Sequence, residues 1–199
     1  MRIILVIILM VLGSVFADVA KVIDQHNLSA IEKFLSSMTT LEAEMTMKIC
    51  HGDSPSDDYK GKIWLDRKNQ LLRINYGRSV MVARDGVLRV LQENERLQEF
   101  FTEDTPAGLL LKPSIDFKSS GMKVEDLKQV DGLWVLSITY DSPAGVIPIT
   151  MYFQPKPVML LLGWTIQNPN GSITDVHLNP DKTHMAVVIP SSVFQIDSP

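Results

Sequence analysis

The chain has 199 residues and a formal net charge of −4, from 23 acidic and 19 basic residues. A nucleic-acid-binding protein needs a basic face, and the lysines and arginines here are scattered among acids, so no nucleic acid partner is expected. The single cysteine, Cys50, excludes an internal disulfide. Because a lone thiol without a neighbouring base is usually a small buried hydrophobe, we expect packing alone to hold the fold.

Residues 1–17 predict a secretory signal peptide. Arg2 precedes an apolar run from Ile3 to Leu12, and small residues follow that run. Val15 and Ala17 fall at the minus-three and minus-one positions of a cleavage after Ala17. The mature protein is then expected to be one exported domain, residues 18–199.

Two alternatives to this cleavage remain. Cleavage after Ala20 would place the charged Asp18 at minus three, which is less favourable. An uncleaved anchor helix needs about 20 residues to span a bilayer, and the apolar run from Ile3 to Phe16 is shorter than that. No cysteine lies near the cut, so the chain is not expected to be a lipoprotein itself.

Residues 20–40 predict an amphipathic helix, because apolar residues recur at intervals of three and four. The apolar stripe consists of Ile31, Phe34, Leu35 and Met38. Asn27 or Ser29 can break or cap the helix, so two helical pieces remain possible.

From Leu41 onward the apolar period changes to two, which is typical of strands with one apolar face. Asp85-Gly86 and Asp131-Gly132 are two-residue hairpin signals. We therefore expect nine or ten antiparallel strands at hairpin spacing. The ranges with this pattern are 41–49, 60–66, 71–76, 80–84, 88–92, 122–130, 133–140, 146–154, 160–167 and 172–178.

The segment DTPAGLLLK predicts a short helix between two groups of strands. Thr105 can cap this helix, Pro106 occupies its first position, where a missing N–H costs nothing, and residues 107–111 form an apolar body. Helices on one side of an antiparallel sheet predict the α+β class, as a layer or a half-closed barrel.

The strands are rich in methionine, and two explanations of this remain open. Unbranched thioethers can repack around a ligand of variable shape, or they can simply fill a core. The strand methionines are Met45, Met47, Met81, Met151 and Met159.

No catalytic motif is apparent: a Gly-x-Ser-x-Gly elbow, a His-Glu-x-x-His pair and a phosphate loop are all absent from the sequence. The four histidines are dispersed. His51 with Asp53 is better explained as a solvated loop pair than as a metal site. We therefore expect no enzymatic activity, no metal and no cofactor.

Six segments, taken in order, resemble the LolA family of periplasmic lipoprotein carriers over nearly the whole mature chain. They are LEAEMTMKI, GKIWLDRKNQLLRINYG, VMVARDGVLRVL, DTPAGLLL, NGSITDVHL and VVIPSSV. The resemblance implies a strongly curved antiparallel half-barrel, an incomplete β-barrel, whose concave apolar face is covered by helices and holds acyl chains. It also implies a periplasmic monomer that receives acylated lipoproteins from an inner-membrane ABC transporter and passes them to an outer-membrane acceptor such as LolB.

In this family an arginine just after the Trp-containing strand hydrogen-bonds the lid helix in the empty, closed state. Arg67 matches that position if the alignment is anchored on Trp64, and Lys68 matches it if the anchor is LRINY. The family's Arg-Pro pair is absent, since Lys68 follows Arg67. A planar guanidinium suits helix-end carbonyls better than an ammonium does. The remaining possibility is that these cations, with Arg73, are solvated on the outer face.

On this resemblance the acyl-chain cavity is expected to be lined by Leu41, Met45, Met47, Ile63, Leu65, Leu72, Ile74, Leu109, Leu110, Ile149, Met151 and Phe153. The lid helix is expected to include Pro106, Ala107 and Leu111. Two other interpretations remain: a lipid-binding or envelope-stress sensor with the same fold, and a structural module with a filled core.

Overall fold

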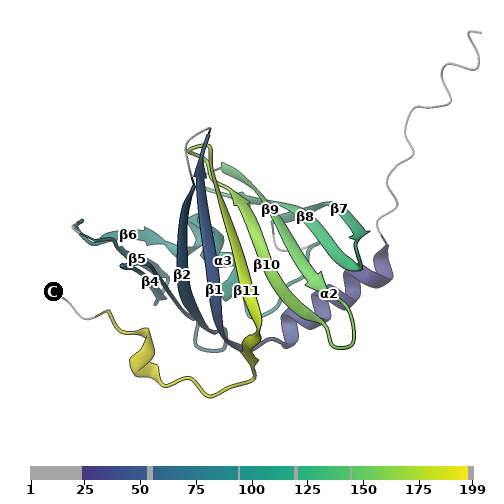
Figure 1. Cartoon of the computed structure of the whole chain (residues 1–199), viewed down its shortest axis with the longest axis horizontal. Helices are drawn as coiled ribbons and strands as arrows, with labels where there is room; N and C mark the ends of the chain where they lie inside the picture. The colour runs from purple at the N-terminus through teal and green to yellow at the C-terminus, as the bar shows by residue number, and fades with distance from the viewer. Residues whose placement is uncertain (1–23, 53–55, 94, 119–120, 144, 197–199) are drawn as a thin grey trace, which may run out of the picture.

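The computed structural model describes residues 24–52, 56–93, 95–118, 121–143 and 145–196. These residues form one 11-stranded antiparallel sheet in the order β6-β5-β4-β3-β2-β1-β11-β10-β9-β8-β7 (Figure 1). The sheet is open, with β6 and β7 at its two edges. The strands are β1 (Thr40–His51), β2 (Asp57–Asp66), β3 (Leu71–Tyr76), β4 (Ser79–Arg84), β5 (Val87–Leu91), β6 (Gln98–Phe101), β7 (Met122–Val130), β8 (Leu133–Ser142), β9 (Gly145–Gln154), β10 (Leu160–Gln167) and β11 (Ser172–Met185).

The predicted signal peptide, residues 1–17, and the beginning of the predicted first helix lie outside the described residues. The described part of that helix is α2 (Gln25–Ser37). Its N-terminal cap is Asp24, whose carboxylate accepts hydrogen bonds from the backbone N–H groups of His26 and Asn27, at 3.0 and 3.2 Å. The helix is therefore continuous through Asn27 and Ser29, and it ends before Thr40, where β1 begins.

Both predicted Asp-Gly hairpins are present. Asp85 and Gly86 have φ values of 54° and 77°, and Asp131 and Gly132 have 50° and 82°. Positive φ at both central residues is the geometry of a type I′ turn, whose twist matches that of the paired strands. The turns accordingly join β4 to β5 and β7 to β8.

Two strand predictions need correction. The strand β6 was not expected, because its four residues are all exposed and show no alternation. The strand β11 continues to Met185 instead of ending at Leu178. Its pairing with β1 jumps from Leu178 to Thr183, so the intervening residues form a bulge. Pro180 lies in this bulge, where its missing N–H breaks no hydrogen bond between the strands.

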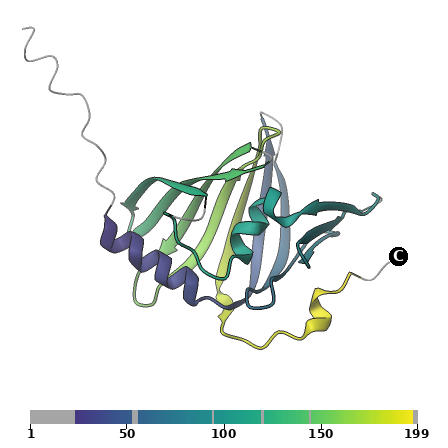
Figure 2. The same cartoon turned by 180° about the vertical axis from the view of Figure 1, so that it is seen from behind.

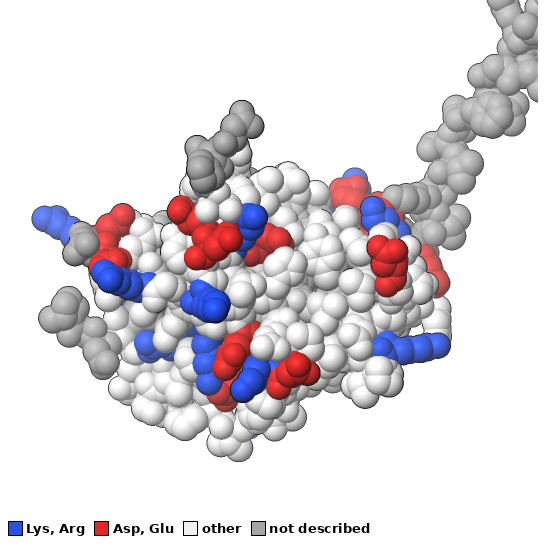
Figure 3. Space-filling view, viewed as in Figure 1, with Lys and Arg blue, Asp and Glu red and all other residues white. Residues whose placement is uncertain are grey.

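The two helices lie on the same side of the sheet, which we call the inner face. Figure 2 shows α2 crossing the ends of β8 to β10, and α3 (Pro106–Leu111) in front of the middle strands. Buried residues of both helices and of the strands form one apolar core. The outer face carries interspersed acidic and basic side chains (Figure 3). Within the described ranges, no helix is long and apolar enough to cross a membrane.

The C-terminal segment returns across the outer face of β3 and β4. Its short helix η2 (Ser191–Phe194) packs against both strands, and Phe194 is buried. The Arg73 guanidinium donates to the carbonyl oxygens of Val193 and Gln195, at 3.0 and 2.6 Å. Arg73 is therefore not simply solvated, because it fastens this segment to the sheet.

Candidate functional site

An apolar cavity of about 320 Å³ lies between α3 and the inner face of the sheet. Strands from both sides of the sheet line it, so it spans the middle of the inner face. The lining residues are Met47, Ile49, Leu72, Ile74, Tyr76, Met81, Leu88, Val90, Phe100, Thr105, Pro106, Ala107, Leu109, Leu110, Ile149, Met151, Trp164, Ile166, Asn168, Thr174 and Val176. Almost all are aliphatic or aromatic, which is the composition of a site for an apolar ligand.

Seven of the residues expected in an acyl-chain cavity line this space. They are Met47, Leu72, Ile74, Leu109, Leu110, Ile149 and Met151. The lid residues Pro106 and Ala107 also line it, whereas Leu111 is buried in the core instead. The five expected residues that do not line the cavity are Leu41, Met45, Ile63, Leu65 and Phe153, which are buried in the core.

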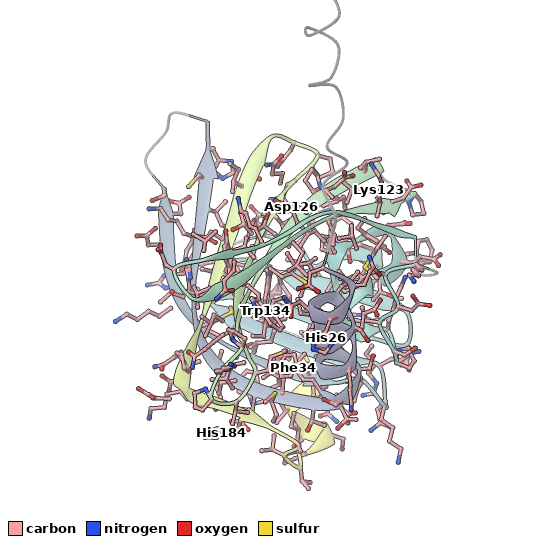
Figure 4. The ribbon with its side chains drawn as sticks, turned by 90° about the vertical axis from the view of Figure 1, so that its right-hand side faces the viewer. His26, Phe34, Lys123, Asp126, Trp134 and His184 are labelled. Carbon is pink, nitrogen blue, oxygen red and sulfur yellow. The ribbon has the colours of Figure 1, made fainter. Side chains whose placement is uncertain are left out.

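Local packing explains why two of these five side chains, Phe153 and Met45, do not line the cavity. The ring of Phe153 meets Phe34 of α2 edge to face, with ring centroids 6.2 Å apart. Figure 4 views this end of the molecule, with Phe34 and Trp134 labelled. Met45 pairs with Gly61, and a Cβ at Gly61 would lie only 2.9 Å from the Met45 terminal methyl. The Met45 side chain thus occupies room left by the glycine.

Several lining residues were not expected from the sequence. Phe100 belongs to β6, the strand that the periodicity missed. Trp164 and Val176 lie beside each other on β10 and β11, in the same row as Met47 and Met151. Extending the alternation of β1 across the sheet would have identified this row, because paired residues share a face.

Arg67, immediately after β2, joins the two helices. Its side chain is only 2% exposed. The Nε atom donates to the Leu110 carbonyl oxygen of α3 at 2.8 Å, and Nη1 donates to the Leu35 carbonyl oxygen of α2. Burial lowers the pKa of the Arg67 guanidinium to about 10, so it remains charged at neutral pH. Lys68 beside it is exposed.

One nitrogen of this guanidinium is left without a hydrogen bond. The Nη2 atom is buried and has no hydrogen-bond partner among the described residues. Taking a charged group out of water is costly unless its hydrogen bonds are replaced. Arg67 therefore holds the helices together with a charge that is incompletely satisfied.

The N-terminal side of α3 has its own attachment. The segment η1 (Thr102–Asp104) precedes α3, and Tyr140 of β8 donates its hydroxyl to the Glu103 carbonyl oxygen at 3.0 Å. Burial raises the pKa of Tyr140. Thr105 occupies the N-cap position as expected, but its hydroxyl donates to the Thr102 carbonyl oxygen instead of capping the helix.

The site offers no evident place for a metal ion. Among the residues that the structure describes, no group of three or more His, Cys, Asp or Glu side chains is arranged to hold one. Cys50 is a free, half-buried thiol near the end of β1.

Comparison with solved structures identifies the fold. The chain superimposes with a TM-score of 0.50 on a domain from Vibrio parahaemolyticus named for outer membrane lipoprotein sorting, over 84% of this chain and 94% of that one, at 8% identity. The two chains therefore share a fold. A LolA superfamily protein from Nitrosomonas europaea is also similar, with a TM-score of 0.48, 8% identity and coverage of 84% and 97%. The resemblance predicted from the sequence is confirmed at the level of the fold, by the domain from Vibrio parahaemolyticus.

A third similar structure, of a DUF1329 family protein from Desulfovibrio piger, has a TM-score of 0.49 and 10% identity, with coverage of 85% of this chain and 95% of that one. No protein-family model and no curated protein matches the chain by sequence.

Proposed function

We propose that this protein is a non-enzymatic carrier of the cell envelope that shelters the acyl chains of lipoproteins in the apolar cavity and carries them to the outer membrane. The observation that supports it most directly is the placement of Arg67. This buried cation ties a short helix over an apolar cavity by hydrogen bonds to helix carbonyl oxygens. Such bonds can be broken and remade without unfolding either helix.

The cavity volume supports a closed, unloaded state. About 320 Å³ corresponds to roughly ten molecules of liquid water. A single acyl chain of roughly 16 carbons has more heavy atoms than that. We propose that the cavity enlarges on loading by displacement of α3, a helix of only six residues.

The energy of acyl-chain burial explains why a carrier needs a latch. Each sheltered methylene contributes about 0.8 kcal/mol, so one chain of roughly 16 carbons contributes about 13 kcal/mol. Several chains would exceed the limit of about 18 to 21 kcal/mol that noncovalent affinities reach, and the cargo would not be released. Hydrogen bonds of a charged group are worth about 1.5 to 3 kcal/mol each, and their loss on loading lowers the net affinity.

The proposed partners follow from this role. The cargo is an acylated lipoprotein, the donor an inner-membrane ABC transporter, and the acceptor an outer-membrane protein such as LolB. We propose that the protein works as a monomer in the periplasm after export by its signal peptide. The lid consists of α3, with Pro106 and Ala107 facing the cavity, and the latch is Arg67 instead of Lys68.

The test compares Arg67→Leu with Lys68→Leu in the mature protein. Arg67→Leu is expected to retain binding of a hydrophobic fluorophore. Its closed state lacks two charged hydrogen bonds and is less stable, so release of the cargo is less favourable. Transfer of a fluorescent lipopeptide to acceptor vesicles is therefore expected to be at least about tenfold slower. Lys68→Leu removes an adjacent exposed charge and is expected to transfer at the wild-type rate. Equal transfer by both variants would contradict the latch, and no fluorophore binding by the wild type would contradict the carrier.

A further inference from the structure

A polar hollow of about 870 Å³ adjoins the apolar cavity, and we call it the vestibule. The two spaces lie side by side, because five residues line both of them: Ile49, Tyr76, Phe100, Asn168 and Thr174. The vestibule lies at the far end of the sheet from Arg67. Along β2, the strand from Asp57 in the vestibule to Asp66 beside Arg67 extends about 30 Å.

One wall of the vestibule is a hydrogen-bonded set of uncharged side chains around the β10–β11 turn. Asn168 donates its amide to the hydroxyl oxygens of Ser172 and Thr174, at 3.0 and 2.9 Å. The side-chain oxygen of Asn170 accepts from both the backbone N–H and the hydroxyl of Ser172, at 3.0 and 2.8 Å. This wall presents amide and hydroxyl groups whose positions are fixed by one another.

The aromatic pair Tyr59 and Tyr76 contributes a further part of the vestibule surface. The two rings meet edge to face with centroids 5.6 Å apart. Burial raises the pKa of Tyr76, so the phenol stays uncharged at neutral pH. Uncharged rings next to amides suit a ligand segment that is polar but not ionised.

The charged side chains of the vestibule are unbalanced. Arg78 is its one Lys or Arg among the described lining residues, and it is already paired with Glu93. Asp57 adds a second carboxylate. An anionic group entering here would meet two carboxylates, the imidazole of His51 and a guanidinium whose charge is already compensated. Like charges brought together disfavour binding.

From this arrangement we propose that the vestibule holds the uncharged polar neck of a diacylated ligand, its glyceryl esters and first backbone amides, and discriminates against anionic phospholipid headgroups. The inference rests on the proposed carrier function and specifies which acyl-bearing molecules the cavity accepts. Acyl chains alone do not distinguish a lipoprotein from a membrane phospholipid. The groups that do are those placed in the vestibule when the chains occupy the cavity.

The experiment uses the mature protein loaded with a hydrophobic fluorophore, displaced by one of two competitors with the same acyl chains. One competitor is a diacylglyceryl peptide with uncharged side chains, and the other is phosphatidylglycerol. The peptide is expected to have an apparent affinity roughly fivefold higher than that of phosphatidylglycerol. The effect is modest because the charges concerned are partly exposed to water. The difference in affinity between the two competitors should become smaller at 1 M salt, because the screening length of electrostatic interactions falls to about 3 Å.

A double variant, D57N/E93Q, keeps side-chain size and removes both carboxylates. It is expected to strengthen competition by phosphatidylglycerol and so to lower the peptide-to-phospholipid affinity ratio toward one. The matched control is E42Q/E99Q, which removes two carboxylates from partly exposed ion pairs with Lys62 and Arg89 outside the vestibule. The control has the same net charge as D57N/E93Q and is expected to keep the wild-type ratio of peptide to phospholipid affinity.

The outcomes separate the two proposals. If neither competitor displaces the fluorophore, the carrier function fails, and the inference fails with it. If both displace it equally, if phosphatidylglycerol is preferred, or if both double variants change the ratio alike, the vestibule inference is overturned while the carrier function stands.

Discussion

The inner face of the sheet is filled at one end and hollow at the other, and the two helices account for the difference. At the filled end, the 13-residue α2 buries Leu28, Ile31 and Leu35 against the strands, and Phe34 contacts Phe153. At the hollow end, the six-residue α3 buries only Leu109 and Leu111. The shorter helix covers the sheet without filling the space beneath it.

This comparison indicates how the fold separates stability from binding. Side chains at the filled end are close-packed, and interiors of that kind tolerate little change in volume. Side chains at the hollow end border the cavity, so they make fewer packing contacts on that side. We therefore expect substitutions at the two ends to have different consequences for unfolding and for ligand affinity.

The largest effect is expected from Leu35→Ala at the filled end. This fully buried side chain leaves a cavity when truncated, and the free energy of unfolding should fall by about 2 to 5 kcal/mol. Leu110→Ala, which enlarges an existing cavity, should cost less. Urea unfolding measures the loss of unfolding free energy in both variants, provided that the m-value is unchanged. Equal losses would show that the two ends are packed alike.

An intermediate effect is expected from the same enlargement at each end. Ala43→Leu at the filled end should destabilise by about 1 to 3 kcal/mol, because the site has no room for three more carbons. Ala107→Leu at the hollow end should stabilise by about 0.5 to 2 kcal/mol by filling the cavity. The second variant should also bind a hydrophobic fluorophore more weakly. Unchanged fluorophore affinity would place the ligand elsewhere.

The smallest effect is expected from Tyr140→Phe, which removes the hydroxyl bonded to the Glu103 carbonyl oxygen. The free energy of unfolding should fall by about 0.5 to 1.5 kcal/mol. Amide hydrogen exchange in α3 should become faster. Tyr152→Phe is the control, because the Tyr152 hydroxyl interacts with Thr165, away from α3. Faster exchange in α3 of the control would mean that Tyr140 has no special role in holding the helix.

The sequence predicted which face of each strand is apolar, but not how far along the strand the cavity extends. Met45 and Met47 share a face and are two residues apart, yet only Met47 lines the cavity. The difference arises from Gly61, which leaves room for Met45. Periodicity describes one strand at a time and therefore carries no information about which helix lies above it.

The cations of the β2–β3 region illustrate the same limit. The family motif drew attention to Arg67, but only the fold brings it to Leu35 and Leu110, far away in sequence. Lys62 lies over the Trp64 ring at 4.9 Å on the outer face. Neighbouring positions thus serve different purposes, which local sequence cannot separate.

The open edges of the sheet bear on how much the protein can hold. A closed barrel has a diameter set by its strand number and shear, so its interior cannot widen without breaking strand pairs. Here β6 and β7 are not joined to each other. The sheet can therefore flatten or curl with every ladder hydrogen bond intact, and the volume beneath its inner face can change.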